Sequence, residues 1–239
     1  MITVAIHQPN FFPWLGYFDK IARCDKFVFL DNVQYPKSGK GQWMNRVMLN
    51  ISGNKSWLTA PVDRSHHGLR MIDEMMFSDG AQWRRKAEKT IVQNYCKRPH
   101  FEAEWPWLRE LLMNEDDRLL EYNMKALTAI IGKIGMDMSK TVLASQLEIN
   151  AKATEMLIGL TKAAGGDAYM CGGGAKGYQN DSDIESSGLK LIYQDFAHPV
   201  YPQGCGEFMP GLSIMDAIFN IGTAAVAGLF PREAAARLQ

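Results

Sequence analysis

The sequence is poor in several features that would assign a protein to a specialised class. Cysteine is scarce, with 4 residues in a chain of 239. These cysteines lie far apart and show no CxxC spacing, which argues against a disulfide framework and against a structural zinc site. Widely spaced thiols are typical of a reducing compartment. We therefore expect a cytoplasmic protein with free cysteines.

Long hydrophobic runs and an excess of one charge are also missing. No apolar stretch approaches the roughly 18 residues that a membrane-spanning helix requires, and the chain begins with no signal-peptide pattern. The 26 basic residues balance 26 acidic residues, so no overall field would attract nucleic acid. We expect no nucleic-acid partner and no membrane span. The expected ligand is a small molecule, and the sequence leaves open whether the protein forms a homo-oligomer.

What the sequence does contain is an α/β pattern. A short β-branched run at 2–6, a helical pattern at 14–23 and a second apolar run at 26–30 make a strand–helix–strand unit. The alternation resumes after residue 140, and further strands are predicted at 141–144, 168–171 and 188–193. Such alternation predicts an α/β fold with a mainly parallel, Rossmann-like sheet.

The middle of the chain interrupts this alternation. Two alternating stretches at 47–51 and 56–61 predict a hairpin with a Gly-Asn turn, or two separate short strands. Helical periodicity then dominates from 80 to about 135. We therefore expect one α/β domain over residues 1–239 with a helical layer or insertion at about 80–135.

Polar residues follow the predicted strands at the edge where α/β proteins bind ligands. His7 and Gln8 end the first strand, Asp31 and Asn32 end the second, and His198 follows the last. Two histidines and a carboxylate suit general acid–base catalysis near neutral pH. We therefore predict that His7, Asp31 and His198 are catalytic, with Gln8 and Asn32 as substrate ligands.

A long polar loop at 33–44 follows the second strand. Loops of this length inside compact domains are usually functional or disordered. Its amide, phenol and amine groups suit a polar or phosphorylated ligand, and an arginine after it suits a bidentate phosphate or carboxylate clamp. The candidate ligands from this part of the chain are Gln34, Tyr35, Lys37, Asn45 and Arg46.

Three glycines follow the predicted strand at 168–171. Glycine at a strand end lets backbone N–H groups approach an anion, although neither Gx4GK[ST] nor GxGxxG is present. A tight turn without a ligand is the alternative. Further along, the spacing of Ser213 and Asp216 fits a helix N-terminus as well as it fits catalysis. The binding candidates from this half of the chain are Gly172, Gly173, Gly174, Tyr178, Tyr201, Gln203, Ser213 and Asp216.

Several of these residues fall in extended motifs. They are HQPNFFPWLGYFDKI from His7, DKFVFLDNVQY at 25–35, Asn45-Arg46, YMCGGGAKGY from Tyr169, and HPVYPQ followed by LSIMDAIFNIG from His198 onward. Together they resemble the WbqC-like family, whose genes tend to lie in bacterial O-antigen and other surface-polysaccharide clusters. The resemblance spans nearly the whole chain and implies a role in surface-polysaccharide biosynthesis.

The leading hypothesis is therefore an enzyme, a transferase, acting on a nucleotide sugar or an amino acid-like substrate. Arg46, Lys37 and the glycines would bind a nucleotide-linked amino sugar, and His7 would remove a proton from its amine during acyl or aminoacyl transfer. The sequence requires no cofactor, and the identity of any cofactor is unknown.

Three alternatives stay open. A HIGH-type nucleotidyltransferase has a similar strand–histidine–helix layout, but Tyr17 follows Gly16 where a second histidine is needed. A non-catalytic sugar-binding or partner-binding protein is the second alternative. The third is a metal-dependent hydrolase using His7, Asp31 and His198, but no HxH or HxxxH spacing supports it, and we assign no metal ligand.

Overall fold

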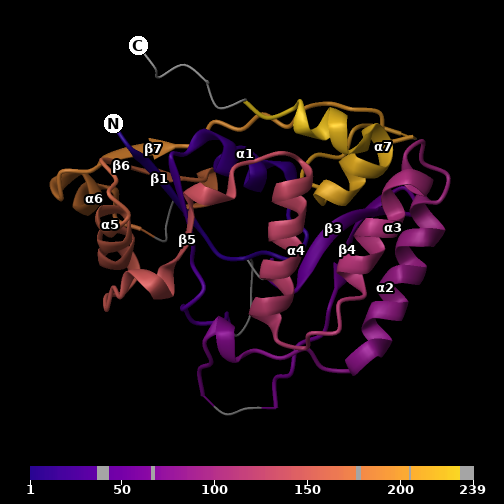
Figure 1. Cartoon of the computed structure of the whole chain (residues 1–239), viewed down its shortest axis with the longest axis horizontal. Coiled ribbons are helices and arrows are strands. Elements are labelled where there is room, and N and C mark those ends of the chain that lie inside the picture. The colour runs from indigo at the N-terminus through magenta and orange to yellow at the C-terminus, as the bar shows by residue number, and fades with distance from the viewer. Residues whose placement is uncertain (37–42, 66–67, 176–178, 205, 232–239) are drawn as a thin grey trace.

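The computed structural model of the chain describes residues 1–36, 43–65, 68–175, 179–204 and 206–231 (Figure 1). Two candidate ligands, Lys37 and Tyr178, lie outside the described residues. No helix formed by the described residues is long and apolar enough to cross a membrane.

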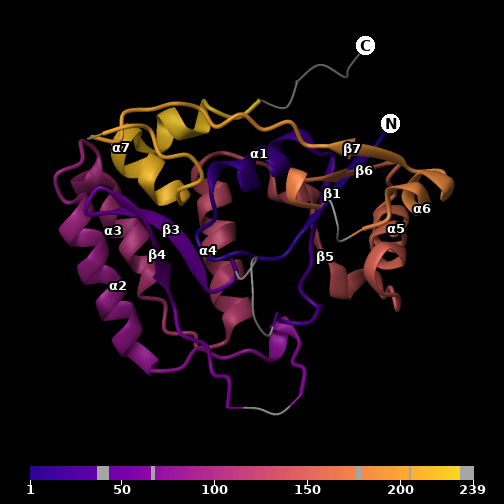
Figure 2. The same cartoon turned by 180° about the vertical axis from the view of Figure 1, so that it is seen from behind.

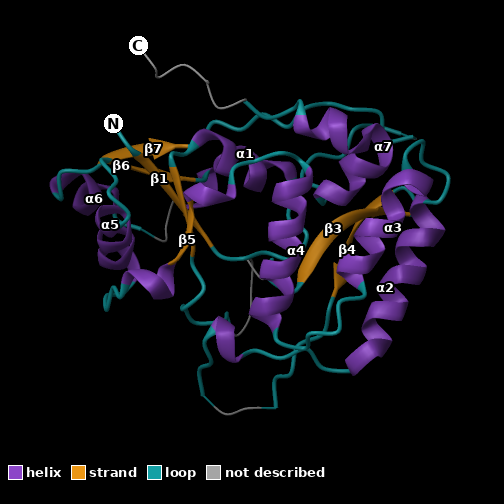
Figure 3. Cartoon of the chain, viewed as in Figure 1, coloured by secondary structure: helices purple, strands orange, loops and turns teal. Residues whose placement is uncertain are grey.

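A five-stranded sheet occupies one side of the molecule (Figure 3). In chain order its strands are β1 (Thr3–His7), β2 (Lys26–Phe29), β5 (Thr141–Leu143), β6 (Ala168–Cys171) and β7 (Lys190–Tyr193). All neighbours pair in parallel in the order β5-β2-β1-β6-β7. The predicted Rossmann-like parallel sheet is confirmed. Because the chain first builds outward from β1 to β5 and then returns to the other side, the topological switch point lies between β1 and β6.

The sheet is covered on both faces, as period-two side-chain alternation requires. Val4 and Ile6 on β1 face one core cluster, and Ala5 between them faces the other. Helix α1 (Leu15–Arg23) contributes Phe18 and Ile21 to the cluster of Ala5. The opposite face is covered by α5 (Ala153–Ala163) and the short α6 (Asp181–Ser186), which lie beside the sheet in both views (Figures 1 and 2).

The other side of the molecule is built from a hairpin and helices. The hairpin strands are β3 (Arg46–Ile51) and β4 (Asn54–Thr59), and the helices are α2 (Gly80–Tyr95), α3 (Phe101–Leu112), α4 (Leu119–Lys133) and α7 (Ile214–Ala227). The predicted helical insertion is thus present as α2 to α4. The hairpin turn is centred on Ser52 and Gly53 instead of the expected Gly-Asn pair, because both residues have the positive φ that a type I′ turn needs.

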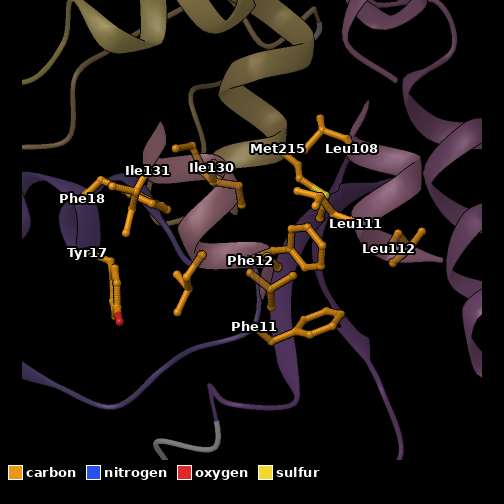
Figure 4. Close-up of a cluster of buried hydrophobic side chains, with 14 of the residues drawn as sticks. Phe11, Phe12, Tyr17, Phe18, Leu108, Leu111, Leu112, Ile130, Ile131 and Met215 are labelled. Carbon is orange, nitrogen blue, oxygen red and sulfur yellow. The ribbon is translucent and has the colours of Figure 1, made fainter. Parts of the chain in front are cut away.

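One hydrophobic core joins the two sides. Figure 4 shows Phe18 of α1 beside Ile131 of α4, and Phe12 near Met215 of α7. Phe18, Ile131 and Met215 are fully buried. The helical insertion therefore packs against α1 and against the segment between β1 and α1, where Phe11 stacks on Tyr122 of α4. This segment directly follows His7, the last residue of β1 and the first predicted catalytic residue.

Two predicted helix boundaries differ from the structure. Helix α5 begins at Ala153 with Lys152 as its N-cap, whereas the sequence predicted Asn150 as the cap. The positive φ of Ala153 prevents the right-handed helix from extending further toward the N-terminus. Helix α7 continues beyond the predicted end at Ile221, but Gly222 has φ 80° and interrupts its geometry. A side chain at this glycine would lie 2.8 Å from Nδ1 of His100, so the interruption accommodates that ring.

Candidate functional site

A cavity of about 910 Å³ opens at the carboxyl ends of β1 and β6. Its described walls come from the segment between β1 and α1, from α1, from the glycine loop (residues 172–174), from residues 194–196, and from Pro36 and Trp43. This is the switch point of the sheet, where open α/β folds bind ligands, and the volume suits a small organic ligand. The cavity is the candidate site.

His7 ends β1 at the base of the cavity. Its Nδ1 lies 3.1 Å from the backbone oxygen of Gln8, and its ring packs edge-on against Tyr17 with centroids 4.9 Å apart. Burial, and to a smaller extent the charge of Lys20, lower the pKa of His7 to about 3, although the hydrogen bond to the Gln8 carbonyl opposes the shift. The imidazole is therefore neutral at physiological pH. When Nδ1–H donates to Gln8, Nε2 keeps a free lone pair.

Lys20 on α1 supplies a buried positive charge to the cavity. Its side chain is only 5 % exposed, and its Nζ lies beside the glycine loop, 3.5 Å from where a side chain at Gly172 would begin. Burial lowers the pKa of Lys20 to about 8, partly opposed by Cys171 and Cys24. No described carboxylate forms an ion pair with it. An amine in this setting is well suited to bind an anion.

The glycine loop lies directly beside His7. Ala5 pairs with Met170 across β1 and β6, and continuing this register by two residues places His7 opposite Gly172. Gly172, Gly173 and Gly174 all line the cavity, as their position after a strand predicted. Burial raises the pKa of the neighbouring Cys171 thiol, so this cysteine is protonated at neutral pH.

An aromatic wall faces these polar groups. The indoles of Trp14 and Trp43 are in contact, with ring centroids 5.0 Å apart, and Phe196 completes the wall. A side chain at Gly16 would lie 2.6 Å from Nε1 of Trp14 and 2.8 Å from Cδ1 of Phe196. Glycine at this helical position therefore lets both rings pack onto α1. Gln194 fixes the same region by donating to the backbone oxygen of Gly16 at 2.9 Å.

The segment between β1 and α1 is held rigidly by the helical insertion. Nδ2 of Asn123, buried on α4, donates to the backbone oxygens of Pro9 (2.9 Å) and Met44 (2.7 Å). The Tyr17 hydroxyl donates to the backbone oxygen of Gln8 at 3.1 Å. These bonds tie the cavity wall to distant parts of the chain, so its polar groups are preorganised.

Asp31 does not line the cavity. It is buried, and its carboxylate accepts hydrogen bonds from the backbone N–H (2.9 Å) and the hydroxyl (2.6 Å) of Ser145. This partner follows β5, the neighbour of β2 on the side away from the switch point. Asn32 is half-buried and also lies outside the described cavity lining. Asp31 and Asn32 therefore lie at the carboxyl ends of β2 and β5, away from His7.

His198 is also separated from the cavity. Its Nδ1 accepts a hydrogen bond from the backbone N–H of Gly211 at 3.3 Å, and its ring packs against Phe196. Burial lowers the pKa of His198, and the charge of Lys55 adds to the effect. Phe196 therefore stands between this histidine and the cavity that it helps to line. The three predicted catalytic residues do not form one constellation.

The candidates around residue 35 make a separate group under the hairpin. The Tyr35 hydroxyl donates to Oδ1 of Asn45 at 3.0 Å, and Nδ2 of Asn45 donates to the backbone oxygen of Ala60 at 2.7 Å. The Arg46 guanidinium stacks over the Trp57 ring, 4.2 Å from its centroid. Gln34 is exposed and bridges to the backbone of Met71. Tyr35 and Asn45 therefore tie the base of the hairpin to the preceding segment, and none of these four candidates belongs to the described cavity lining.

The candidates near the C-terminus form a saturated buried cluster. Asp216 accepts hydrogen bonds from the hydroxyls of Tyr95 (2.9 Å) and Tyr201 (2.7 Å) and from the amide of Gln203 (3.2 Å). Burial raises the pKa of Asp216, and the three donors oppose the shift. Ser213 caps α7 by accepting from the backbone N–H of Met215. The capping explanation thus fits Ser213, whereas Asp216 binds the tyrosines instead of closing a capping box.

Among the part of the chain that the structure describes, no three His, Cys, Asp or Glu side chains come together as a metal-binding group. The metal-hydrolase alternative proposed His7, Asp31 and His198 as ligands. Asp31 bonds to Ser145 and His198 to Gly211, so the ligand set that this alternative needs is not assembled.

Comparison with known proteins identifies the family. The model of the WbqC-like protein family matches residues 8–227. This chain belongs to the WbqC-like family. It is also 30% identical, over 94% of its own length and 96% of the relative's, to an uncharacterized protein, Rv1507c, of Mycobacterium tuberculosis. No solved structure matches the chain.

Several residues of this WbqC-like cavity were missed by reasoning from the sequence, among them Lys20, Asn10 and Trp14. Lys20 lies next to Asp19 on α1 and looks like one half of an exposed charge pair, yet both side chains are buried. Its spacing of four residues from Gly16 could have revealed a cavity-facing strip, because residues four apart share a helix face. Asn10, in the HQPN motif, also lines the cavity and is 1 % exposed. Nothing in its local pattern separates it from an ordinary turn asparagine.

Proposed function

We propose that this WbqC-like protein is a transferase of surface-polysaccharide biosynthesis that attaches an acyl or aminoacyl group to the amine of a nucleotide-linked sugar. The pathway rests on the family, whose members resemble this chain over residues 8–227. The reaction class rests on the cavity, which combines a neutral histidine, a buried lysine and a glycine loop at the switch point of the sheet.

The observation that carries the proposal is the position of Lys20. A buried ammonium group without a described acidic partner is costly, and an anionic ligand offsets that cost. The glycine loop lies against the same amine and exposes backbone without side chains. We assign the phosphate groups of the nucleotide-linked sugar to this position and not to Arg46, whose guanidinium stacks over Trp57. Lys37 lies outside the described residues, and its predicted role stays a prediction.

His7 is then placed to handle the proton of the reacting amine. In group transfer, the sugar nitrogen attacks the carbonyl carbon of an activated acyl donor, such as a thioester or acyl phosphate. A C–N bond forms, the bond to the donor's leaving group breaks, and the nitrogen loses one proton. Nε2 of His7 accepts that proton when Nδ1–H donates to Gln8.

Ligand binding would also prepare His7 for this role. Burial and the charge of Lys20 both lower the pKa of His7 in the free protein. A bound phosphate beside Lys20 neutralises that charge and raises the pKa of His7 toward its ordinary value. The base therefore becomes stronger when the substrate is present.

The test is product formation. The full chain is incubated with a panel of nucleotide-linked amino sugars and activated acyl or aminoacyl donors, and products are identified by mass spectrometry. We expect a product whose mass equals the sugar nucleotide plus the acyl group. His7→Ala should lower its rate about 100-fold or more, because general-base catalysis contributes about that factor.

His198→Ala is the matched control, since His198 lies outside the described cavity lining and should retain most of the activity. Equal losses in the two variants would contradict the assignment of His7 as the base. No product across the panel would overturn the transferase proposal. Pyrophosphate release from nucleoside triphosphates would favour the nucleotidyltransferase alternative instead.

A further inference from the structure

Asn10 is an unusual residue in the wall of the cavity. Its side chain is 1 % exposed, and neither Oδ1 nor Nδ2 has a hydrogen-bond partner among the residues that the structure describes. Buried side-chain amides almost always have partners, and an exception in a native protein requires an explanation. Because Asn10 lines the cavity, the missing donor and acceptor are best supplied from inside it.

The backbone around Asn10 is fixed on both sides. The carbonyl of Pro9 accepts from Asn123 at 2.9 Å, and the N–H of Phe11 donates to the carbonyl of Trp43 at 2.9 Å. The segment therefore cannot easily turn the amide toward another protein group. The amide nitrogen and oxygen, both buried and without a partner, are therefore held side by side in a fixed position in the cavity wall.

The other buried asparagines that support this region behave differently. Asn45 donates to the carbonyl of Ala60, and Asn123 donates to two carbonyls. Both hold distant backbone segments together, which is the usual role of a buried asparagine. Asn10 has no such structural role in the described chain, so its conformation serves something other than the fold.

The chemistry of Asn10 defines what it recognises. A carboxamide pairs best with a planar edge that carries a donor next to an acceptor, and nucleobases carry such an edge. The indoles of Trp14 and Trp43 line the same cavity, and aromatic side chains bind bases by stacking. An amide edge and an aromatic wall together match a flat heterocycle better than a sugar ring.

We propose that Asn10, Trp14 and Trp43 form a nucleobase subsite, with the diphosphate of the same ligand bound by Lys20 and the glycine loop. This inference rests on the proposed function, in which the substrate is nucleotide-linked, and it names the part of the ligand that each wall holds. The segment after β1, together with Trp43, then contacts the base. The loop after β6, together with Lys20 of α1, contacts the phosphates.

The acyl group of an N-acylated sugar carries the same kind of amide edge as a nucleobase. The experiment therefore distinguishes a nucleobase from an N-acyl group as the ligand of Asn10. Isothermal titration calorimetry measures the binding of UDP, CDP, ADP, GDP, inorganic pyrophosphate and N-acetylglucosamine 1-phosphate to the full wild-type chain. We expect at least one nucleoside diphosphate to bind about 10-fold or more tightly than pyrophosphate, because base contacts add to phosphate contacts. Pyrophosphate binding as tightly as all four nucleotides would overturn the proposal without recourse to any variant.

The decisive variant is Asn10→Ala. It should weaken the preferred nucleoside diphosphate about 10- to 100-fold, the effect of losing two hydrogen bonds, and leave pyrophosphate unchanged. Asn50→Ala is the matched control, because Asn50 is a buried asparagine on β3 outside the described cavity lining. Lys20→Met should weaken nucleotide and pyrophosphate alike.

Two further outcomes would overturn the inference. Unchanged nucleotide affinity in Asn10→Ala would show that the amide binds only water. Loss of N-acetylglucosamine 1-phosphate binding alone would show that Asn10 reads an acyl group. These results are independent of the transfer assay, since base-dependent binding without product would leave the subsite intact and remove the transferase proposal.

Discussion

Two groups of buried polar side chains in this protein look alike in the sequence and differ in the structure. The Asp216 cluster consists of Asp216, Tyr95, Tyr201 and Gln203. The cavity group consists of His7, Asn10 and Lys20. In the first, the carboxylate accepts three hydrogen bonds. In the second, the Asn10 amide has no hydrogen-bond partner and Lys20 forms no ion pair among the described residues. Buried polar groups with all their hydrogen bonds satisfied stabilise the fold, whereas buried polar groups without partners in a cavity wall are candidates for ligand binding.

The largest expected effect comes from breaking the saturated group. Asp216→Ala leaves the hydroxyls of Tyr95 and Tyr201 and the amide of Gln203 without their shared acceptor. Buried donors left unpaired cost about 1 kcal/mol or more each, so the free energy of unfolding should fall by about 4 kcal/mol. Urea denaturation monitored by fluorescence measures the change.

Asp183→Ala provides the control for this prediction, because Asp183 is an exposed carboxylate on α6 and should change stability by less than about 0.5 kcal/mol. Nucleotide affinity per folded molecule should be unchanged in both variants. An Asp216→Ala protein that is as stable as the wild type but no longer binds nucleotide would show that the cluster belongs to the site.

The positions of the strands, and hence the edge where the site lies, could be predicted from the sequence. Periodicity in β1, β2 and β6 is local, and polar residues that follow such strands fall at one edge of a parallel sheet. This reasoning found His7 and the glycine loop, which line the cavity. It placed Asp31 in the same set, because Asp31 also follows a strand. Only the strand order, a long-range property, puts β6 next to β1 and moves Asp31 to the β2–β5 edge.

Hydrogen-bond satisfaction could not be predicted from the sequence. Asn10, Asn45 and Asn123 are the same residue type in similarly mixed surroundings, and all are buried. Asn123 reaches carbonyls more than 70 positions away in the chain, while Asn10 reaches no described group. The same limit applies to Lys20, whose amine lies beside Gly172, a residue far away in the sequence.

The second-largest effect is expected for Lys20→Met, which removes the buried charge from the cavity group. Burial lowers the pKa of Lys20 from 10.5 to about 8. Between these two values the unfolded chain keeps a proton that the folded chain has released, so this residue makes stability rise with pH. At pH 7 the folded protein carries the cost of a buried charge, and replacing it by Met should stabilise the free protein by up to about 3 kcal/mol. The advantage should vanish as the pH approaches 10.5.

Urea denaturation of both proteins from pH 7 to pH 10.5 measures this difference, in which the titration of tyrosines and cysteines common to both largely cancels. Lys140→Met is the contrasting variant. Lys140 is also buried, but its Nζ donates to the backbone oxygen of Cys24 at 3.2 Å. Removing it should destabilise the protein at pH 7, by about 1 kcal/mol or more. Equal effects of the two substitutions would contradict the distinction between partnered and unpartnered lysines.

The smallest expected effect on stability concerns the aromatic wall. A Cβ at Gly16 would lie 2.6 Å from Nε1 of Trp14 and 2.8 Å from Cδ1 of Phe196, so Gly16→Ala must displace both rings. Overpacking costs about 1–3 kcal/mol, and the helix preference of alanine returns about 1 kcal/mol, so the net loss should be about 1 kcal/mol. Gly132→Ala on α4 meets no atom within 4 Å and should instead gain about 1 kcal/mol.

Binding separates the two glycine variants more sharply than stability does. If Trp14 stacks on a base, its displacement in Gly16→Ala should weaken the preferred nucleoside diphosphate while pyrophosphate, which would contact Lys20 and the glycine loop, keeps its affinity. Gly132→Ala should bind both ligands like the wild type. Equal weakening of both ligands in Gly16→Ala would mean that the ring shift reaches Lys20, four residues along the same helix, and that the aromatic wall and the anion site are not independent.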